Sequence, residues 1–214
     1  EILQVGSLVG RTFNASLISE VISGTTAADI AELCESLTER GLLSESPDRP
    51  FTYTFAHSLI QETVASEIST SRRMRTHAAI ASYLDQRYGT DAPDRFPQIA
   101  NHYLESEPLL GPDKVLEFVA KAAEHAFSIQ AYKYIVELSE RGIEIAKESS
   151  HNLLGDLLAL RARAGNTMGP WPYSNQIRWD WQAEAFEHFI TTKEDAKAVG
   201  VALLAGSIGG ARGT

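Results

Sequence analysis

The spacing of apolar residues over the first 56 positions predicts three short helices. Residues 1–8 place apolar side chains on one face of a short buried helix, and Gly10 ends it. A second helix is predicted over about 15–22. A third is predicted over 27–40, because two threonines offer an N-cap and apolar residues then recur at helical spacing. The core-facing residues expected in this third helix are Ile30, Leu33 and Leu37.

A β-hairpin is predicted after these helices. Residues 42–45 and 51–55 flank a turn that contains two prolines, and the second run alternates aromatic with polar residues, which is typical of a half-buried strand. Three helices and a hairpin are the elements of a winged helix. The sequence therefore predicts a winged-helix-like domain.

Two more helices follow the hairpin, over about 57–68 and 72–88. The apolar face expected for the first of them consists of Leu59, Ile60, Val64 and Ile68. A loop with two prolines and three charged residues then interrupts the helical pattern. We place the domain boundary there, so that the winged-helix-like domain and its following helices occupy residues 1–90.

Residues 91–214 are predicted to form helical hairpin repeats. Two long helices, over about 112–129 and 132–148, are joined by a very short turn and must form an antiparallel hairpin. Three more helices resemble degenerate copies of this unit at a spacing of about 35 to 40 residues, near that of tetratricopeptide repeats. Within the first hairpin, Gly142 fits the small-residue position of such repeats and Tyr132 an aromatic one. The predicted fold class is mainly α, with tetratricopeptide-like repeats that continue in a longer protein.

Charge argues against DNA binding by the first 56 residues. The chain has a net charge of −9, and this segment holds three arginines, no lysine and eight acidic residues. The third predicted helix, which would read DNA in a helix-turn-helix, carries four acidic residues before Arg40. Since DNA affinity comes largely from neutralising phosphates, this face would repel the backbone. The four acidic residues are Asp29, Glu32, Glu35 and Glu39.

Neither a membrane span nor a disulfide is expected. The most apolar run, 199–208, is short and interrupted by glycine, whereas a bilayer requires about 20 apolar residues. The first residues match neither a signal peptide nor an initiator methionine, so we expect a segment cut from a longer chain. Cys34 is the single cysteine, and its apolar neighbours predict a buried thiol. These features favour a cytoplasmic protein without a membrane partner.

No catalytic or metal-binding motif stands out in the sequence. Residues 6–12 superficially resemble a phosphate-binding loop, but three residues rather than four separate the glycines, and an arginine replaces the lysine. The six histidines lack zinc-site spacing. Glu184 and His188 lie one helical turn apart, where a solvated pair is favoured over a two-ligand metal site. We therefore expect no catalytic residue, no metal and no cofactor within this segment.

All three tryptophans fall within eleven residues, together with one tyrosine. Aromatic side chains in a groove between repeats would make good anchors for a protein partner. The alternative, which we favour, is that this irregular connection packs against its own repeat. The candidate partner-binding residues are Trp171, Tyr173, Trp179 and Trp181.

Five short strings along residues 1–150 resemble, in their order, the signal-transduction ATPases with numerous domains, or STAND proteins. The most specific one is the strand-to-helix junction Phe55-Ala56-His57-Ser58-Leu59. The others are Leu3 to Phe13, Arg40-Gly41-Leu42-Leu43, Ala100-Asn101-His102-Tyr103-Leu104 and Ala122-Ala123-Glu124-His125-Ala126. The ending Arg141-Gly142-Ile143-Glu144-Ile145 is most similar to members fused to a class III nucleotide cyclase, with LuxR-type transcription regulators close behind.

This resemblance implies a P-loop ATPase domain upstream, followed by a winged helix and tetratricopeptide-like repeats. In the family, the winged-helix histidine contacts the β-phosphate of bound ADP and holds the resting state. His57 matches that histidine, whereas Ser58 replaces the aspartate that follows it in the family motif. The nucleotide, ADP or ATP, would be shared with the upstream ATPase domain. The alternative role for His57 is structural, as a histidine that caps the helix or packs under the hairpin.

The sequence thus leads to two hypotheses. In the first, this is a non-catalytic regulatory region in which the winged helix senses nucleotide through His57 and Ser58. Its repeats bind a protein or small-molecule inducer, and its output is a cyclase or a transcription regulator. In the second, it is a stand-alone tetratricopeptide-like scaffold for protein interactions. A DNA-binding role for residues 1–56 is disfavoured by charge.

Overall fold

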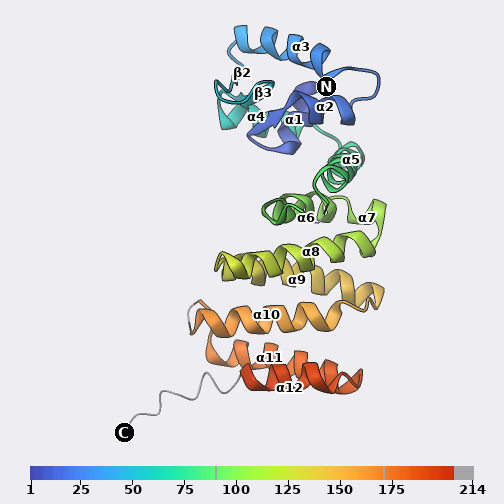
Figure 1. Ribbon diagram of the computed structural model, residues 1–214, viewed down its shortest axis with the longest axis vertical. Helices are drawn as coiled ribbons and strands as arrows, with labels where there is room; N and C mark the ends of the chain where they lie inside the picture. The colour runs from blue at the N-terminus through green and yellow to red at the C-terminus, as the bar shows by residue number, and fades with distance from the viewer. Residues whose placement is uncertain (90, 171, 205–214) are drawn as a thin grey trace. The chain divides into compact units, whose positions relative to one another are not determined.

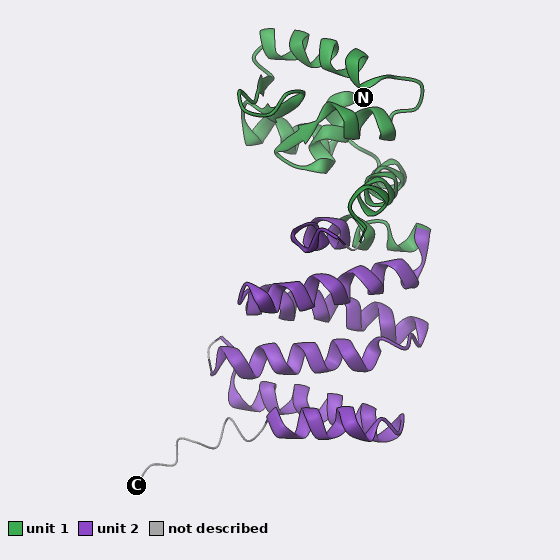
Figure 2. Cartoon of the chain, in the orientation of Figure 1, with its two compact units in different colours: residues 1–90, 102–109 green, residues 91–101, 110–214 purple. Residues whose placement is uncertain are grey.

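The computed structural model describes residues 1–89, 91–170 and 172–204. It is mainly helical and includes a small three-stranded antiparallel sheet (Figure 1), so the mainly helical class predicted from the sequence is confirmed. The chain forms two compact units (Figure 2). Unit 1 comprises residues 1–90 and 102–109, and unit 2 comprises residues 91–101 and 110–214.

Unit 1 begins with three helices, α1 (Ile2–Val9), α2 (Ala15–Val21) and α3 (Ala27–Glu39). The start of α3 is fixed by a capping box, in which the Thr26 hydroxyl accepts from the Asp29 N–H and the Asp29 carboxylate accepts from the Thr26 N–H. Its end is followed by Gly41 at φ 72°, a left-handed conformation that favours glycine. These local signals explain why α3 was predicted from the sequence.

The sheet of unit 1 has the strand order β1-β3-β2, with β1 (Thr12–Asn14), β2 (Leu43–Glu45) and β3 (Thr52–Phe55). Both pairings with β3 are antiparallel. The hairpin of β2 and β3 was predicted. Strand β1 was not, and it lies directly after the glycines that superficially resemble a phosphate loop.

An aromatic cluster forms the core of unit 1. The Phe13 ring lies 5.6 Å from that of Phe55 and 6.3 Å from that of Tyr53, measured between centroids, and all three residues are buried. Gly6 in α1 admits this cluster, since a Cβ there would lie 2.7 Å from the Phe13 ring. Cys34 is fully buried beside it, as predicted, and burial raises the pKa of its thiol to about 11.

Unit 1 continues with α4 (Ser58–Ser66) and α5 (Thr70–Tyr88). A short 3-10 turn, α6 (Phe96–Leu104) and α7 (Glu107–Leu110) follow. Two predicted core positions are wrong, because Leu33 is 51% exposed and Leu59 is 70% exposed. The predicted helical spacing was right in both helices, but each residue lies at the edge of its apolar stripe and faces outward.

Besides the 3-10 turn and the first part of α6, the described residues of unit 2 form α8 (Pro112–Ser128), α9 (Tyr132–Ser149), α10 (Leu154–Met168), α11 (Asn175–Thr191) and α12 (Asp195–Leu203), and each of these five helices packs against the next. Three of the turns between these helices share one backbone conformation. Gln130, Ser150 and Lys193 adopt left-handed backbone conformations after α8, α9 and α11. In each case the next N–H bonds back to a carbonyl five residues earlier, which closes the helix end.

Three glycines let the helices of unit 2 approach closely. A Cβ at Gly142 would lie 2.8 Å from Val119, and one at Gly165 would lie 2.8 Å from the Trp181 ring. A Cβ at Gly155 would lie 2.6 Å from the Phe189 ring. Each glycine therefore seats a bulky side chain of a neighbouring helix. Within the part of the chain that the structure describes, none of the helices has both the length and the apolar character needed to cross a membrane.

Candidate functional site

His57 lies at the N-cap of α4, two positions after the last residue of strand β3, and is exposed. Its backbone is extended (φ −136°), and its side chain makes no capping hydrogen bond. Ser58 is the first residue of α4 and is also exposed. Both candidates for nucleotide sensing are thus accessible, and neither is held in the core. The capping role considered for His57 is not seen, because no side-chain bond to the helix start is made.

Two arginines in the first turn of α5, Arg72 and Arg73, make local contacts. Arg72 pairs with Glu1, with 2.8 Å between Nη2 and Oε1. The Arg73 guanidinium donates to the carbonyl of Ala65 at the end of α4. Arg72 therefore pairs with an exposed acid, and Arg73 helps to connect α5 to α4.

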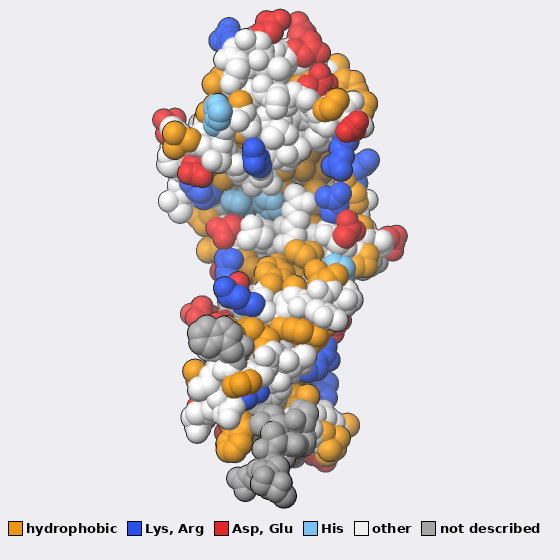
Figure 3. Space-filling view, turned by 90° about the vertical axis from the view of Figure 1, so that its left-hand side faces the viewer, with side chains coloured by type: hydrophobic (Ala, Val, Ile, Leu, Met, Phe, Trp, Pro, Cys, Tyr) orange, Lys and Arg blue, Asp and Glu red, His pale blue; other side chains and the backbone are white. Residues whose placement is uncertain are grey.

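The outer face of α3 is acidic. Glu32, Glu35 and Glu39 are all exposed, and Asp29 is the residue of the capping box. Figure 3 shows acidic side chains gathered around the end of unit 1 that carries α3. This surface would repel nucleic-acid phosphates.

The aromatic candidates of the second unit have different environments. Tyr173 and Trp181 form an edge-on pair with ring centroids 4.8 Å apart. Trp181 also contacts Gly165, and the guanidinium carbon of Arg161 lies over the Trp181 ring, 5.1 Å from the ring centroid. Trp179 is 55% exposed, and Trp171 lies outside the described residues. Tyr173 and Trp181 therefore pack against each other, and Trp181 packs against α10, in line with the alternative favoured from the sequence.

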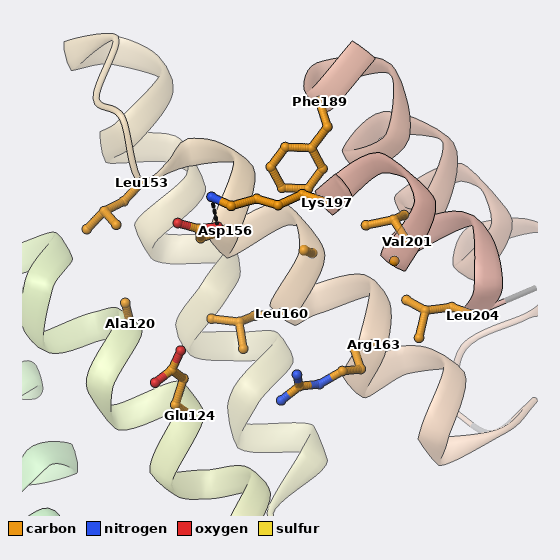
Figure 4. Close-up of a pocket in the computed structure, with 12 residues that line it drawn as sticks. Ala120, Glu124, Leu153, Asp156, Leu160, Arg163, Phe189, Lys197, Val201 and Leu204 are labelled. Atoms are coloured by element: carbon orange, nitrogen blue, oxygen red, sulfur yellow. Dashed lines mark hydrogen bonds and ion pairs between the residues drawn. The ribbon is translucent and has the colours of Figure 1, made fainter. Parts of the chain in front are cut away.

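Unit 2 also carries an open groove that the sequence did not reveal. Most of its lining residues belong to α8, α10 and α12, Phe189 of α11 also contributes, and its volume is about 400 Å³. Its floor is apolar and includes Leu160, Val201 and Leu204 (Figure 4). This groove, called the α8–α10–α12 groove below, is large enough to receive side chains of a bound molecule.

Four charged residues line the α8–α10–α12 groove. Lys197 of α12 pairs with Asp156 of α10 at 2.8 Å (Figure 4) and with Glu194 at 2.9 Å. Glu124 of α8 and Arg163 of α10 are exposed and extend into the groove. A repeat-based search could have found them, because Glu124 and Arg163 are 39 positions apart, as are Ala120 and Ala159.

Glu184 of α11 belongs to a structural network. The predicted solvated pair with His188 is not formed. Instead, Glu184 pairs with Lys147 at 2.6 Å and with Arg161. Burial raises the pKa of this carboxyl, but the hydrogen bonds from Lys147 and Arg161 outweigh it and leave the pKa below its usual range. His188 packs against Gly155. Among the described residues no group of three or more metal-ligating side chains is close enough to hold an ion.

A buried histidine pair in unit 1 was also missed. His77 of α5 and His102 of α6 are 6% and 2% exposed, and their Nδ1 atoms lie 2.8 Å apart. One ring must donate and the other accept, so at least one imidazole is neutral. Burial and the neighbouring His77 lower the pKa of His102 to about 3. Burial likewise lowers the pKa of His77, with Glu105 opposing and Arg73 reinforcing this shift.

Comparisons with known protein families, with curated proteins and with solved structures found no match to this chain. Function is therefore argued from the residues of this chain.

Proposed function

We propose that this chain is the non-catalytic regulatory and interaction region of a STAND-type signalling ATPase. Unit 1 is a winged helix that senses ADP or ATP held by an upstream ATPase domain, and unit 2 consists of tetratricopeptide-like repeats that bind a protein or small-molecule inducer. The output is a nucleotide cyclase or a transcription regulator. The observation that carries the proposal is the exposed His57 at the junction of β3 and α4.

The connectivity of unit 1 supports a winged helix. Its elements follow the order α1, β1, α2, α3, β2, β3, and the central strand β3 pairs with both others. Strand β1, which the sequence did not predict, supplies the third strand that a winged helix uses between its first two helices. The acidic face of α3 supports a role in protein contact rather than DNA contact.

The placement of His57 suits contact with a phosphate. An exposed imidazole can donate a hydrogen bond to an anion without breaking contacts in the core. Such a charge-assisted bond contributes roughly 1.5 to 3 kcal/mol, which corresponds to about one to two decades in affinity. Ser58 adds a hydroxyl beside it, where the family motif has a carboxylate.

The test is made on the full-length product of the gene that encodes this chain. Dissociation of a fluorescent ADP analogue is timed for the wild type, for His57→Ala and for Leu59→Ala. Leu59 is a matched control, because it lies in the same helix start and is 70% exposed. We expect His57→Ala to speed release about tenfold and Leu59→Ala to leave it unchanged. Equal rates for all three proteins would remove the sensor role.

The turns and glycines of unit 2 support the repeat interpretation. Helices α8, α9 and α11 end in the same left-handed turn, and Gly142 seats the side chain of a neighbouring helix where tetratricopeptide repeats use a small residue. The α8–α10–α12 groove is lined mainly by alternate helices, as expected for the face on which repeats bind partners.

A second candidate function is a stand-alone scaffold. It is favoured by one observation, namely that the α8–α10–α12 groove is built from residues of unit 2 alone. In a scaffold, partner binding is independent of nucleotide. Partner affinity measured on the full-length protein with ADP and then with ATP separates the two, because the regulatory region changes its affinity between these states and the scaffold does not.

A further inference from the structure

Two opposite charges flank the apolar floor of the α8–α10–α12 groove. Glu124 reaches in from α8 and Arg163 from α10, and Leu160 also lines the groove (Figure 4). Neither side chain forms an ion pair with another residue in the described part of the chain. Each therefore presents an unneutralised charge to a molecule that enters the groove.

Arg163 is already oriented for such contact. Its guanidinium carbon lies 3.7 Å from the centroid of the Phe127 ring, so the two groups stack. A stacked guanidinium keeps its N–H groups in its own plane, where they remain free to donate to a carboxylate. Less side-chain freedom is then lost on binding than for an arginine free in solvent.

The other two charges of the groove are already matched. Lys197 is paired with both Asp156 and Glu194. This leaves one negative and one positive group without an ion-pair partner among the described residues, Glu124 and Arg163, on neighbouring repeats. A purely acidic or purely basic ligand would meet one like charge, whereas a ligand with both signs would match both.

We propose that the α8–α10–α12 groove binds a dipolar peptide segment of a partner protein. The segment carries a basic residue for Glu124, an acidic residue for Arg163 and apolar residues between them. The apolar side chains lie on the floor formed by Leu160, Val201 and Leu204. The groove, with a volume of about 400 Å³, is large enough to hold them. This inference rests on the proposed function, in which unit 2 binds a partner, and it specifies the chemistry of that partner.

Three blocked peptides test the proposal, each titrated into the ¹⁵N-labelled chain 1–214 and followed by NMR. The dipolar peptide is acetyl-Gly-Lys-Leu-Leu-Asp-Gly-amide. In the acid-only peptide glutamine replaces the lysine, and in the base-only peptide asparagine replaces the aspartate. We expect shifts in α8, α10 and α12, and an affinity for the dipolar peptide about fivefold above that for either other peptide, since exposed ion pairs contribute up to about 1 kcal/mol.

Two variants identify which residue of the groove recognises each charge of the peptide. Arg163→Gln removes the advantage of the dipolar over the base-only peptide, and Glu124→Gln removes its advantage over the acid-only peptide. Lys193→Gln and Glu187→Gln are the matched controls, because they remove the same charges from exposed positions of unit 2 outside the groove. Both controls are expected to keep the full fivefold preference.

The proposal is overturned by equal affinities for the three peptides, by binding that leaves α8, α10 and α12 unshifted, or by no binding of any peptide. Its failure is distinguishable from failure of the proposed function. If the peptides fail while His57→Ala still speeds ADP release, only the groove inference falls. If the peptides bind as expected while ADP release is unchanged, the sensor role falls and the groove inference stands.

Discussion

The two units build their cores from contacts of different range along the chain. In unit 1, Phe13 of β1 meets Tyr53 and Phe55 of β3, some 40 residues later, so that the first helices and the sheet depend on one another. In unit 2, each helix packs mainly on its neighbour in sequence. Repeat arrays held by nearest-neighbour interfaces lose stability locally, whereas a core with long-range contacts is lost as a whole.

The test with the largest expected effect on stability removes one buried aromatic ring from each unit. Phe13→Ala and Phe189→Ala each leave a cavity and are expected to cost about 3 to 5 kcal/mol. Amide hydrogen exchange followed by mass spectrometry shows where protection is lost. We expect Phe13→Ala to weaken protection throughout residues 1–66, and Phe189→Ala to weaken it mainly in α11 and α12. Loss throughout unit 2 in the second variant would contradict the nearest-neighbour description.

Substitution of two separate glycines in unit 2 tests how closely its helices pack. Gly142→Val places a branched side chain against Val119 and Leu157, where even a Cβ would lie 2.8 Å from Val119. We expect a loss of about 2 to 3 kcal/mol in the free energy of unfolding, measured by urea denaturation. Gly200→Ala is the control, because nothing lies within 4 Å of a Cβ there. It should stabilise α12 by up to about 1 kcal/mol, and a destabilising result would show that α12 needs its glycine.

Acid should weaken unit 1 through its buried histidine pair. The pKa of His102 is lowered to about 3 in the folded chain, from an ordinary value of 6.5. The unfolded chain therefore binds more protons between these values, and stability falls as the pH drops below 6.5. At pH 5 the expected loss is about 2 kcal/mol relative to pH 7.5. Urea denaturation at both pH values measures it.

His102→Gln supplies the comparison for this pH dependence. It removes the titrating ring and should flatten the stability difference between the two pH values, even if the variant is less stable at both. His57→Gln changes an exposed histidine and should keep the dependence. A pH profile that is the same in wild type and His102→Gln would place the acid sensitivity elsewhere.

The smallest expected effects compare two helix caps. Thr26 caps α3 in a reciprocal box with Asp29, whereas Ser174 caps α11 through a single bond to the Ile177 N–H. Replacing a capping hydroxyl by alanine costs about 1 kcal/mol. We expect Thr26→Ala to reach or exceed this value, because the capping box is lost as well, and Ser174→Ala to cost less. Thermal unfolding resolves the two, and a reversed order would show that the box adds nothing.

Local signals were readable from the sequence, and long-range partners were not. The limits of α3 were found because Thr26 and Gly41 mark them. Strand β1 was missed because three residues carry no periodicity and become a strand only by pairing with β3. Leu33 and Leu59 were misplaced because helical spacing defines a stripe without showing which of its edges is covered.

The candidate sites divide in the same way. His57 could be singled out because it stands at a junction that is continuous in sequence. His77 and His102 are 25 positions apart, and Glu124 and Arg163 are 39 apart, so their proximity follows only from helix packing. The predicted spacing of about 35 to 40 residues between hairpins covers the second pair, whereas no predicted spacing covers the first.

Because Cys34 is buried, chemical labelling of its thiol can measure how often unit 1 opens. It is the only thiol in the chain, it is fully covered, and its raised pKa keeps it protonated near neutral pH. Since alkylating and disulfide reagents react with the exposed thiolate, labelling must wait until α3 detaches. The labelling rate therefore counts opening events of unit 1 alone, without any introduced probe, while unit 2 contributes nothing to the signal.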